Sequence, residues 1–295
     1  MMKSGSISFC IADVRINVLV PEPIWLYESR QPYLSFINDG YGLYDVLIYL
    51  TFDLICRPKR PLFSCNNSWA IYQKPDGWVI AQENNNQINW CLDTNIDFSI
   101  INFFLSRQAP FETKGKFLIE NPFCYPLDQI LLMNYFSRNQ ISIIHSAGLL
   151  IGDETFLFPG ISGSGKSTLI RQFMKKGNLN ILSDERIIVR KKEGFFRGYG
   201  TPWPGDAGAA LNESGLLGGI FFINHAKSNE VKDITSRKAF ERLIPVVSIP
   251  WYNRDVIPNM LDFIEDIVKT VPVFELQFRP DTEVVSFLED FVTKM

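Results

Sequence analysis

One stretch indicates the fold of this chain most strongly: Phe156-Leu157-Phe158-Pro159-Gly160-Ile161-Ser162-Gly163-Ser164-Gly165-Lys166-Ser167-Thr168. Residues 160–167 fit the Walker A pattern G-x-x-x-x-G-K-[ST] at every position. The apolar run before the glycines predicts a strand over 155–158, and the residues after them predict a helix over 166–176. A strand, a glycine-rich loop and a helix in this order are typical of a loop that binds phosphate.

The chemistry of such a loop assigns a role to each of its residues. Glycines let the backbone curl so that its N–H groups point at phosphate oxygens, and the helix N-terminus adds partial positive charge. Lys166 is expected between the β- and γ-phosphates, and the Ser167 hydroxyl is expected on Mg²⁺. ATP is the expected nucleotide, GTP is the alternative, and a turn that binds nothing is the non-functional interpretation. The predicted nucleotide-binding residues are Gly160, Ser162, Gly163, Ser164, Gly165, Lys166, Ser167 and Thr168.

An acidic pair follows the next predicted strand, 180–182. Asp184 lies 184 − 166 = 18 residues after Lys166, which is one helix plus one strand, so the pair is expected beside the loop. A carboxylate there can hold Mg²⁺ or accept the proton of an attacking hydroxyl. Asp184 is the candidate for both roles and Glu185 is its partner; a solvated surface turn is the alternative.

These motifs, together with Ile144-His145-Ser146, resemble the kinase domain of HPr kinase/phosphorylase, and more closely the stand-alone HPr-kinase-related proteins, some of which act in bacterial peptide modification. His145 lies 160 − 145 = 15 residues before the loop, as in that family. The resemblance covers about 125–295. It implies a P-loop fold shared with ATP-type phosphoenolpyruvate carboxykinases, and a serine hydroxyl as phosphate acceptor.

The chain departs from the family pattern at three places. Thr168 stands where the family usually has Glu, and Glu185 stands where it has Asp. The arginine- and glycine-rich C-terminal signature is missing, and Arg254 is the nearest arginine. Arg254 is a candidate for offsetting charge on the γ-phosphate, and His145 for moving a proton. A helix-start arginine paired with Asp255 and a packed core histidine are the respective alternatives.

Other segments carry weaker indications. Residues 198–206 are rich in turn formers and predict a loop that lines the site as a flap, with Thr201, Trp203 and Asp206 as contacts. An ordered surface loop is the alternative. Gly148 to Gly152, together with Asp153 and Glu154, predict a turn over 148–154, and His225 is predicted to be structural.

The chain divides by composition into a β-rich N-terminal domain, 1–118, and a kinase domain, 119–295. In the first domain, 6–20 predicts one or two strands, and 69–81 predicts a hairpin with an Asp76-Gly77 turn. Asn84–Asn86 predicts a further turn, before a strand over 88–92. The predicted fold class is α/β, a P-loop kinase domain with a smaller β-rich domain.

Composition excludes several classes of function. The net charge is -3, so no global basic field attracts nucleic acid. No apolar run is long enough for a membrane span or an export signal, which makes the cytoplasm the expected location. The five cysteines are scattered without metal-ligand spacing, and two histidines exclude a His-rich metal site.

The leading interpretation is a kinase that transfers the γ-phosphate of ATP to a serine-type hydroxyl of a peptide or protein. A small-molecule kinase of the same fold is one alternative. A nucleotide-dependent binding or regulatory module is the other, and a homo-oligomer is left open.

Overall fold

The computed structural model describes residues 2–38, 40, 42–53, 58–65, 69–84, 87–105, 111–177 and 180–295. It divides the chain into two compact units, Met1–Tyr135 and Phe136–Met295. The division lies further along the chain than the boundary expected after residue 118, because residues 116–128 are tied into the first unit. β12 (Lys116–Glu120) pairs with β4 (Ile24–Tyr27), and Asp128 accepts a hydrogen bond from the Tyr33 hydroxyl.

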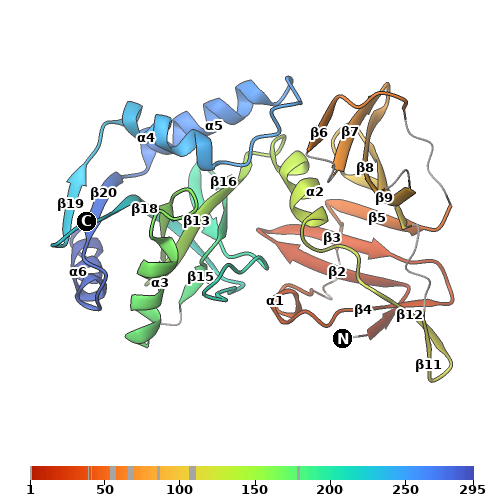
Figure 1. Cartoon of the computed structure of the whole chain (residues 1–295), viewed down its shortest axis with the longest axis horizontal. Coiled ribbons are helices and arrows are strands. Elements are labelled where there is room, and N and C mark those ends of the chain that lie inside the picture. The colour runs from red at the N-terminus through yellow and green to blue at the C-terminus, as the bar shows by residue number, and fades with distance from the viewer. Residues whose placement is uncertain are drawn as a thin grey trace. The chain divides into compact units, whose positions relative to one another are not determined.

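The first unit is built on two sheets (Figure 1). The four-stranded sheet has the order β1-β4-β12-β11, where β1 is Met2–Ser4 and β11 is Phe111–Thr113. The eight-stranded sheet has the order β2-β3-β5-β10-β9-β8-β7-β6. Its strands are β2 (Ser6–Ile11), β3 (Val14–Leu19), β5 (Val46–Thr51), β6 (Phe63–Cys65), β7 (Trp69–Lys74), β8 (Gly77–Asn84), β9 (Gln87–Asn95) and β10 (Ile100–Leu105). The described part of the unit also contains the helices α1 (Gln31–Leu34) and α2 (Leu127–Phe136), which ends at the boundary.

The strand predictions for this unit are confirmed, with one correction at the hairpin. β2 and β3 occupy 6–20, and β7 and β8 form the hairpin. Pro75 and Asp76 make its turn, while Gly77 already pairs with Lys74. A methyl group on Gly77 would stand 1.8 Å from the Thr94 carbonyl oxygen. A glycine is therefore needed at this position for the close approach of β9, and not for the turn. Asn85 and Asn86 of the predicted second turn lie outside the described residues.

The second unit is a mixed α/β structure around one sheet of order β14-β13-β16-β17-β18-β20-β19. β14 also pairs with β18, which closes β14, β13, β16, β17 and β18 into a ring, and β15 pairs with β13. The strands are β13 (Ile141–Ile151), β14 (Glu154–Pro159), β15 (Ile181–Ser183), β16 (Arg186–Lys192), β17 (Phe195–Tyr199), β18 (Ser214–His225), β19 (Glu230–Asp233) and β20 (Val273–Phe278).

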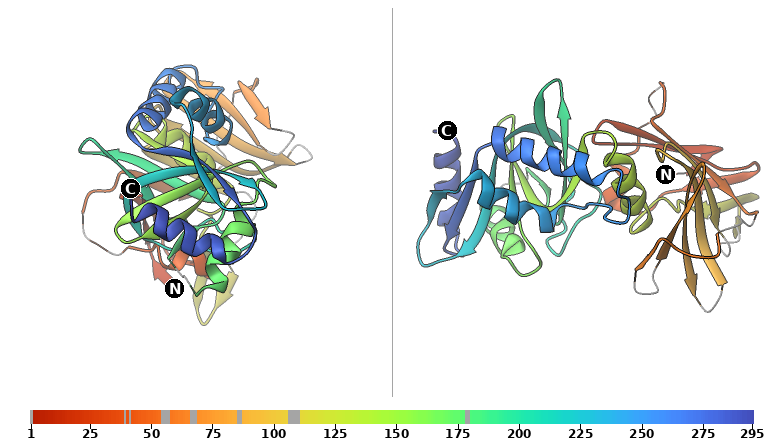
Figure 2. Two further views of the ribbon diagram at one scale, coloured as in Figure 1. Left: turned by 90° about the vertical axis from the view of Figure 1, so that its left-hand side faces the viewer. Right: turned by 90° about the horizontal axis from the view of Figure 1, so that it is seen from above.

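Helices cover this sheet on both faces (Figures 1 and 2). They are α3 (Lys166–Lys175), α4 (Ser236–Leu243), the 3-10 turn η1 (Ile244–Val246), α5 (Ile257–Thr270) and α6 (Glu283–Val292). The sheet has a hydrophobic core on each face, and neighbouring residues of β18 point into different cores. Phe221 packs with residues of α3 and α6, and Phe222 packs with residues of α4 and α5. No helix among the described residues is long and apolar enough to cross a membrane.

Two expectations for this unit are corrected. The turn predicted over 148–154 is strand as far as Ile151 and again from Glu154, and only Gly152 and Asp153 turn. Gly148 lies within β13, and a methyl group there would stand 2.5 Å from Ile187 Cδ1. The missing side chain therefore allows close packing against Ile187. The loop predicted from residue 198 begins later, since Gly198 and Tyr199 belong to β17 and pair with β16 and β18.

Candidate functional site

The glycine loop joins β14 to α3 as predicted, and three of its glycines are required by geometry. Gly163 and Gly165 have φ angles of 80° and 105°, in the left-handed region that other residues rarely adopt. A methyl group on Gly160 would stand 2.3 Å from Ser164 Oγ. That oxygen is buried and has no hydrogen-bond partner within the described chain. The loop therefore has the tight curvature that turns backbone N–H groups towards a phosphate.

Lys166 opens α3 and is buried, with 5 % of its surface exposed. Its Nζ donates hydrogen bonds to the carbonyl oxygens of Gly160 at 2.7 Å and Ile161 at 3.2 Å. Burial lowers the pKa of Lys166, while the carboxylates of Glu185 and Asp184 oppose that shift. The Lys166 ammonium is thus hydrogen-bonded to the start of the loop, and the charges of Glu185 and Asp184 act on it.

His145 and Glu185 form a pair beside this lysine. The antiparallel pairing of β13 and β16 places His145 opposite Arg186, and the His145 carbonyl accepts the N–H of Gly160 at 3.2 Å. His145 Nε2 lies 3.3 Å from Glu185 Oε1, and 38 % of the Glu185 side chain is exposed. Burial and then the charge of Lys166 lower the pKa of His145. A neutral imidazole next to a solvent-accessible carboxylate can accept a proton.

Asp184 is buried and its carboxylate is hydrogen-bonded to the segment after β17. Oδ1 accepts the N–H groups of Gly205 at 2.8 Å and Ala209 at 3.1 Å, and Oδ2 accepts that of Ala207 at 2.7 Å. A carboxylate has about four lone-pair positions, so these bonds leave about one, on Oδ2. The predicted metal ligand therefore also anchors a neighbouring loop.

The predicted flap is held down at several points. The Thr201 hydroxyl is buried and donates to the Arg186 carbonyl at 2.7 Å, and Ser183 Oγ donates to the Trp203 carbonyl at 3.2 Å. Asp206 is exposed. Together with Asp184, these contacts make 200–209 an ordered segment packed beneath the acidic pair.

The remaining predicted residues lie in different places. Ser162 is exposed at the tip of the loop, and Ser167 and Thr168 are half-buried in the first turn of α3. Arg254 is exposed in the turn before α5, and no hydrogen bond or ion pair joins it to another described residue. The structure brings together Lys166, His145, Asp184 and Glu185, and among the described residues no hydrogen bond or ion pair links Arg254 to these four.

Two residues near the loop were not predicted as site residues. Arg186 lowers the pKa of both Lys166 and His145, and its position directly after the acidic pair was a usable signal. A methyl group on Gly165 would stand 2.7 Å from His225 Nε2, so this imidazole lies against the start of α3. His225 is distant in sequence from every motif, so only the pairing of β18 with β14 reveals it.

The Ser167 and Asp184 oxygens suit Mg²⁺, an ion that needs only one or two ligands from the protein. They do not suit a metal ion whose ligands all come from the protein. In the part of the chain that the structure describes, no three His, Cys, Asp or Glu side chains converge on one point. Mg²⁺ typically takes one or two protein oxygens and fills its other positions with water and substrate phosphates. The Ser167 hydroxyl and the remaining Asp184 Oδ2 lone pair would supply such oxygens, so the residues present fit this ion.

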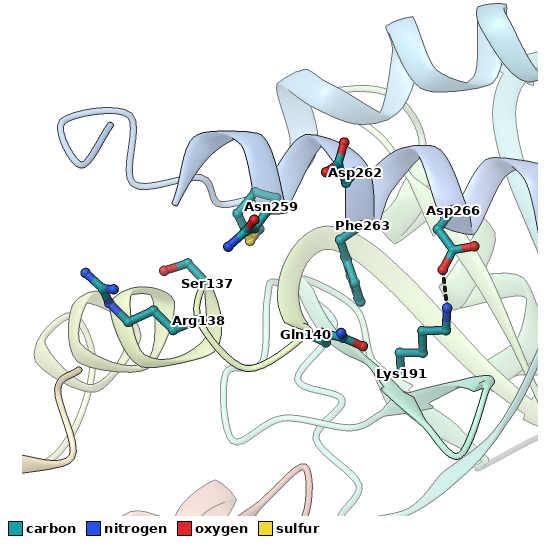
Figure 3. A pocket seen from close by; sticks show the side chains of 9 residues that line it. Ser137, Arg138, Gln140, Lys191, Asn259, Asp262, Phe263 and Asp266 are labelled. Carbon is teal, nitrogen blue, oxygen red and sulfur yellow. Dashed lines mark hydrogen bonds and ion pairs between the residues drawn. The ribbon is translucent and has the colours of Figure 1, made fainter. Parts of the chain in front are cut away.

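A separate cavity of about 490 Å³ lies between α5, β16 and the turn after α2 (Figure 3). Lys191 and Asp266 form an ion pair on its wall. None of its lining residues belongs to the glycine loop: they are Ser137, Arg138, Gln140, Lys191, Asn259, Met260, Asp262, Phe263 and Asp266.

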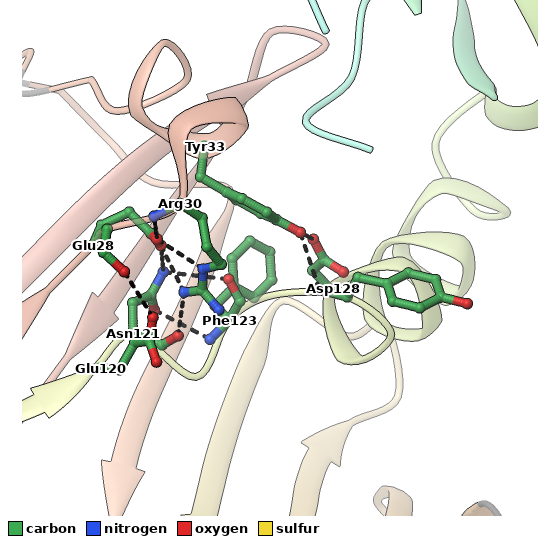
Figure 4. Close-up of polar contacts among 9 residues, drawn as sticks. Glu28, Arg30, Tyr33, Glu120, Asn121, Phe123 and Asp128 are labelled. Atoms are coloured by element: carbon green, nitrogen blue, oxygen red, sulfur yellow. Dashed lines mark hydrogen bonds and ion pairs between the residues drawn. The ribbon is translucent and has the colours of Figure 1, made fainter. Parts of the chain in front are cut away.

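The first unit contains a buried ion pair (Figure 4). Arg30 donates to Glu28 from Nε at 2.8 Å and from Nη2 at 2.7 Å, and Asn121 Nδ2 donates to Glu28 at 3.0 Å. Burial alone would raise the pKa of Glu28, but these hydrogen bonds outweigh it and the pKa is lowered. The contacts described for this network join Glu28, Arg30 and Asn121, which links the β4 and β12 regions of the first unit.

No protein-family model matches this chain, and no curated protein matches it. The features of the chain that indicate a function are therefore the loop, Lys166 and the pair His145–Glu185.

Proposed function

We propose that this protein is an ATP-dependent kinase that transfers the γ-phosphate to a hydroxyl group. The observation that carries the proposal is the position of Lys166, inside a complete phosphate loop and beside the pair His145–Glu185. Phosphate binding and proton acceptance are the two needs of a kinase, and both are met within one small region. The resemblance to HPr-kinase-related proteins agrees with this chemistry.

The loop binds the donor. The backbone N–H groups of 160–167 receive the phosphates, and Lys166 exchanges its bonds to the loop carbonyls for the β- and γ-phosphate oxygens. Ser167 and Asp184 would hold Mg²⁺, which when bound neutralises charge on the phosphates.

The pair His145–Glu185 receives the proton. The acceptor oxygen bonds to the γ-phosphorus as the bond from that phosphorus to the β–γ bridging oxygen breaks. The acceptor proton passes to Glu185, which lies beside the imidazole of His145, and ADP leaves. A hydroxyl needs such a base because it is a weak nucleophile at neutral pH.

The acceptor we propose is a serine-type hydroxyl of a peptide or protein, and the first unit offers surfaces for binding it. β6 ends the eight-stranded sheet and β11 ends the four-stranded sheet, and Phe63 and Phe111 on these strands are exposed. An extended peptide can add to such an edge through backbone hydrogen bonds. A small alcohol such as free serine is the alternative acceptor.

One observation favours a second candidate function, a nucleotide-dependent binding module with little transfer. Asp184 makes three backbone hydrogen bonds, so its carboxylate couples the phosphate site to 205–209. A bound nucleotide that competes for Asp184 would then alter this segment.

The test uses γ-labelled ATP with Mg²⁺, alone and with serine-containing peptides or free serine. The kinase proposal expects label on the acceptor, in a phosphoester that resists hydroxylamine. A hydroxylamine-labile product would exclude an alcohol acceptor. Nucleotide binding without transfer to any peptide, serine or other alcohol would favour the binding module.

A further inference from the structure

His225 occupies the edge of the sheet where a nucleotide would bind. It is the last residue of β18, which runs parallel to β14 on one side and to β20 on the other. The carboxyl ends of these three strands therefore share one edge, and the glycine loop follows β14 at that edge. A nucleotide whose phosphates bind the glycine loop therefore lies at the edge where β18 ends.

The imidazole of His225 is exposed and is positioned by two contacts. Its Nε2 lies against Gly165, where a methyl group would approach to 2.7 Å. Its ring lies 4.9 Å from the ring of Phe278, the residue opposite His225 in the pairing of β18 with β20. These contacts leave part of an aromatic surface open to solvent beside the start of α3.

The orientation of a bound triphosphate follows from the two strands that flank β14. β13 carries His145 on one side, next to Glu185, and β18 carries His225 on the other. The γ-phosphate must face the residues that accept the proton. The opposite end of the triphosphate then emerges on the β18 side.

We infer that His225 contacts the nucleoside half of the bound nucleotide, packing its imidazole against the ribose and base. The inference rests on the proposed kinase function for the direction of the triphosphate. It makes His225 a residue that distinguishes a nucleoside triphosphate from inorganic triphosphate. Stacking of an aromatic side chain on a nucleobase strengthens binding about 5- to 150-fold and depends little on which base is bound.

Calorimetric titration of the full chain with Mg·ATP and with inorganic triphosphate tests this assignment. His225→Ala should weaken ATP binding about tenfold and change triphosphate binding by less than about twofold. His225→Phe should retain most of the ATP affinity, because it restores the ring. Lys166→Ala should weaken both ligands at least about tenfold, because it removes a charge that binds phosphate. Lys232→Ala, an exposed change on β19, is the neutral control.

Wild-type ATP affinity in His225→Ala would overturn the inference, and so would equal loss of both ligands, which indicates a distorted loop. A wild-type chain that binds triphosphate no more weakly than ATP would also overturn it. These binding outcomes do not test phosphoryl transfer, which the labelled-ATP assay on the wild-type protein tests separately. Selective loss of ATP in His225→Ala, with no transfer to any acceptor, would support the inference while the kinase proposal failed.

Discussion

The carboxylate of Asp184 accepts a 2.8 Å hydrogen bond from the backbone N–H of Gly205. This bond, with two similar ones from the same segment, satisfies a buried negative charge that lies within the field of Lys166. Asp184 is therefore a structural residue whatever its part in phosphoryl transfer.

Asp184→Asn should lower both stability and transfer. Both carboxylate oxygens accept N–H bonds, so an amide must turn its NH₂ group towards at least one backbone donor. A buried donor left unsatisfied costs about 1–3 kcal/mol of unfolding free energy. Transfer should fall at least about 10²-fold, because the neutral amide would no longer help to hold Mg²⁺ on the phosphates. Chemical denaturation and the labelled-ATP assay measure the two effects, with the exposed Asp233→Asn as control. Unchanged stability would contradict the anchoring role.

Glu185→Gln separates chemistry from folding. The Glu185 side chain is 38 % exposed and contacts His145, so its loss should leave the melting temperature unchanged. Transfer should fall at least about 10²-fold, because the amide cannot accept the acceptor proton. Calorimetry should show nucleotide affinity close to that of the wild type. Transfer at the wild-type rate would show that the proton leaves by another route.

His145 should make stability depend on pH. Burial and the nearby charges of Lys166 and Arg186 lower its pKa in the folded chain, against the opposing effect of Glu185. In the unfolded chain it titrates near its ordinary value of about 6.5. As pH falls from about 6.5 to the lowered folded pKa, only the unfolded chain gains the proton, so the unfolding free energy decreases.

Denaturation of the wild type and of His145→Gln at about pH 7.5 and about pH 5.5 checks this expectation. The wild type should lose more stability than the variant over this range. An equal loss in both proteins would show that His145 does not cause the dependence.

Arg30→Ala should destabilise the first unit. The Glu28 side chain is fully buried, so removing Arg30 leaves its charge without its principal partner. Breaking a buried ion pair in this way costs about 3–5 kcal/mol. The double change Glu28→Met with Arg30→Met removes both charges and should recover part of that loss. Chemical denaturation monitored by tryptophan fluorescence measures both. A double variant as unstable as Arg30→Ala would contradict this account.

Patterns within a few residues of each other predicted the local structure well. The apolar run before Pro159 and the residues after Gly165 predicted β14 and α3 where the structure has them. Gly148 and Gly77 misled the prediction because a glycine can serve close packing as well as a turn. At both positions a neighbouring strand fills the space that a side chain would take. Sequence does not reveal that neighbour.

The sequence by itself determined the glycine loop between β14 and α3, because its curvature depends on consecutive residues. Glycines there can adopt positive φ angles and have no side chain to clash. The position of the acidic pair near that loop followed from its spacing, and the position of His145 was implied by the family resemblance. Only the tertiary structure decided what Asp184 and His225 contact. The donors to Asp184 come from 205–209, and Gly165 meets His225 across the parallel pairing of β14 and β18. Such contacts arise from strand pairing between distant segments, which local composition does not specify.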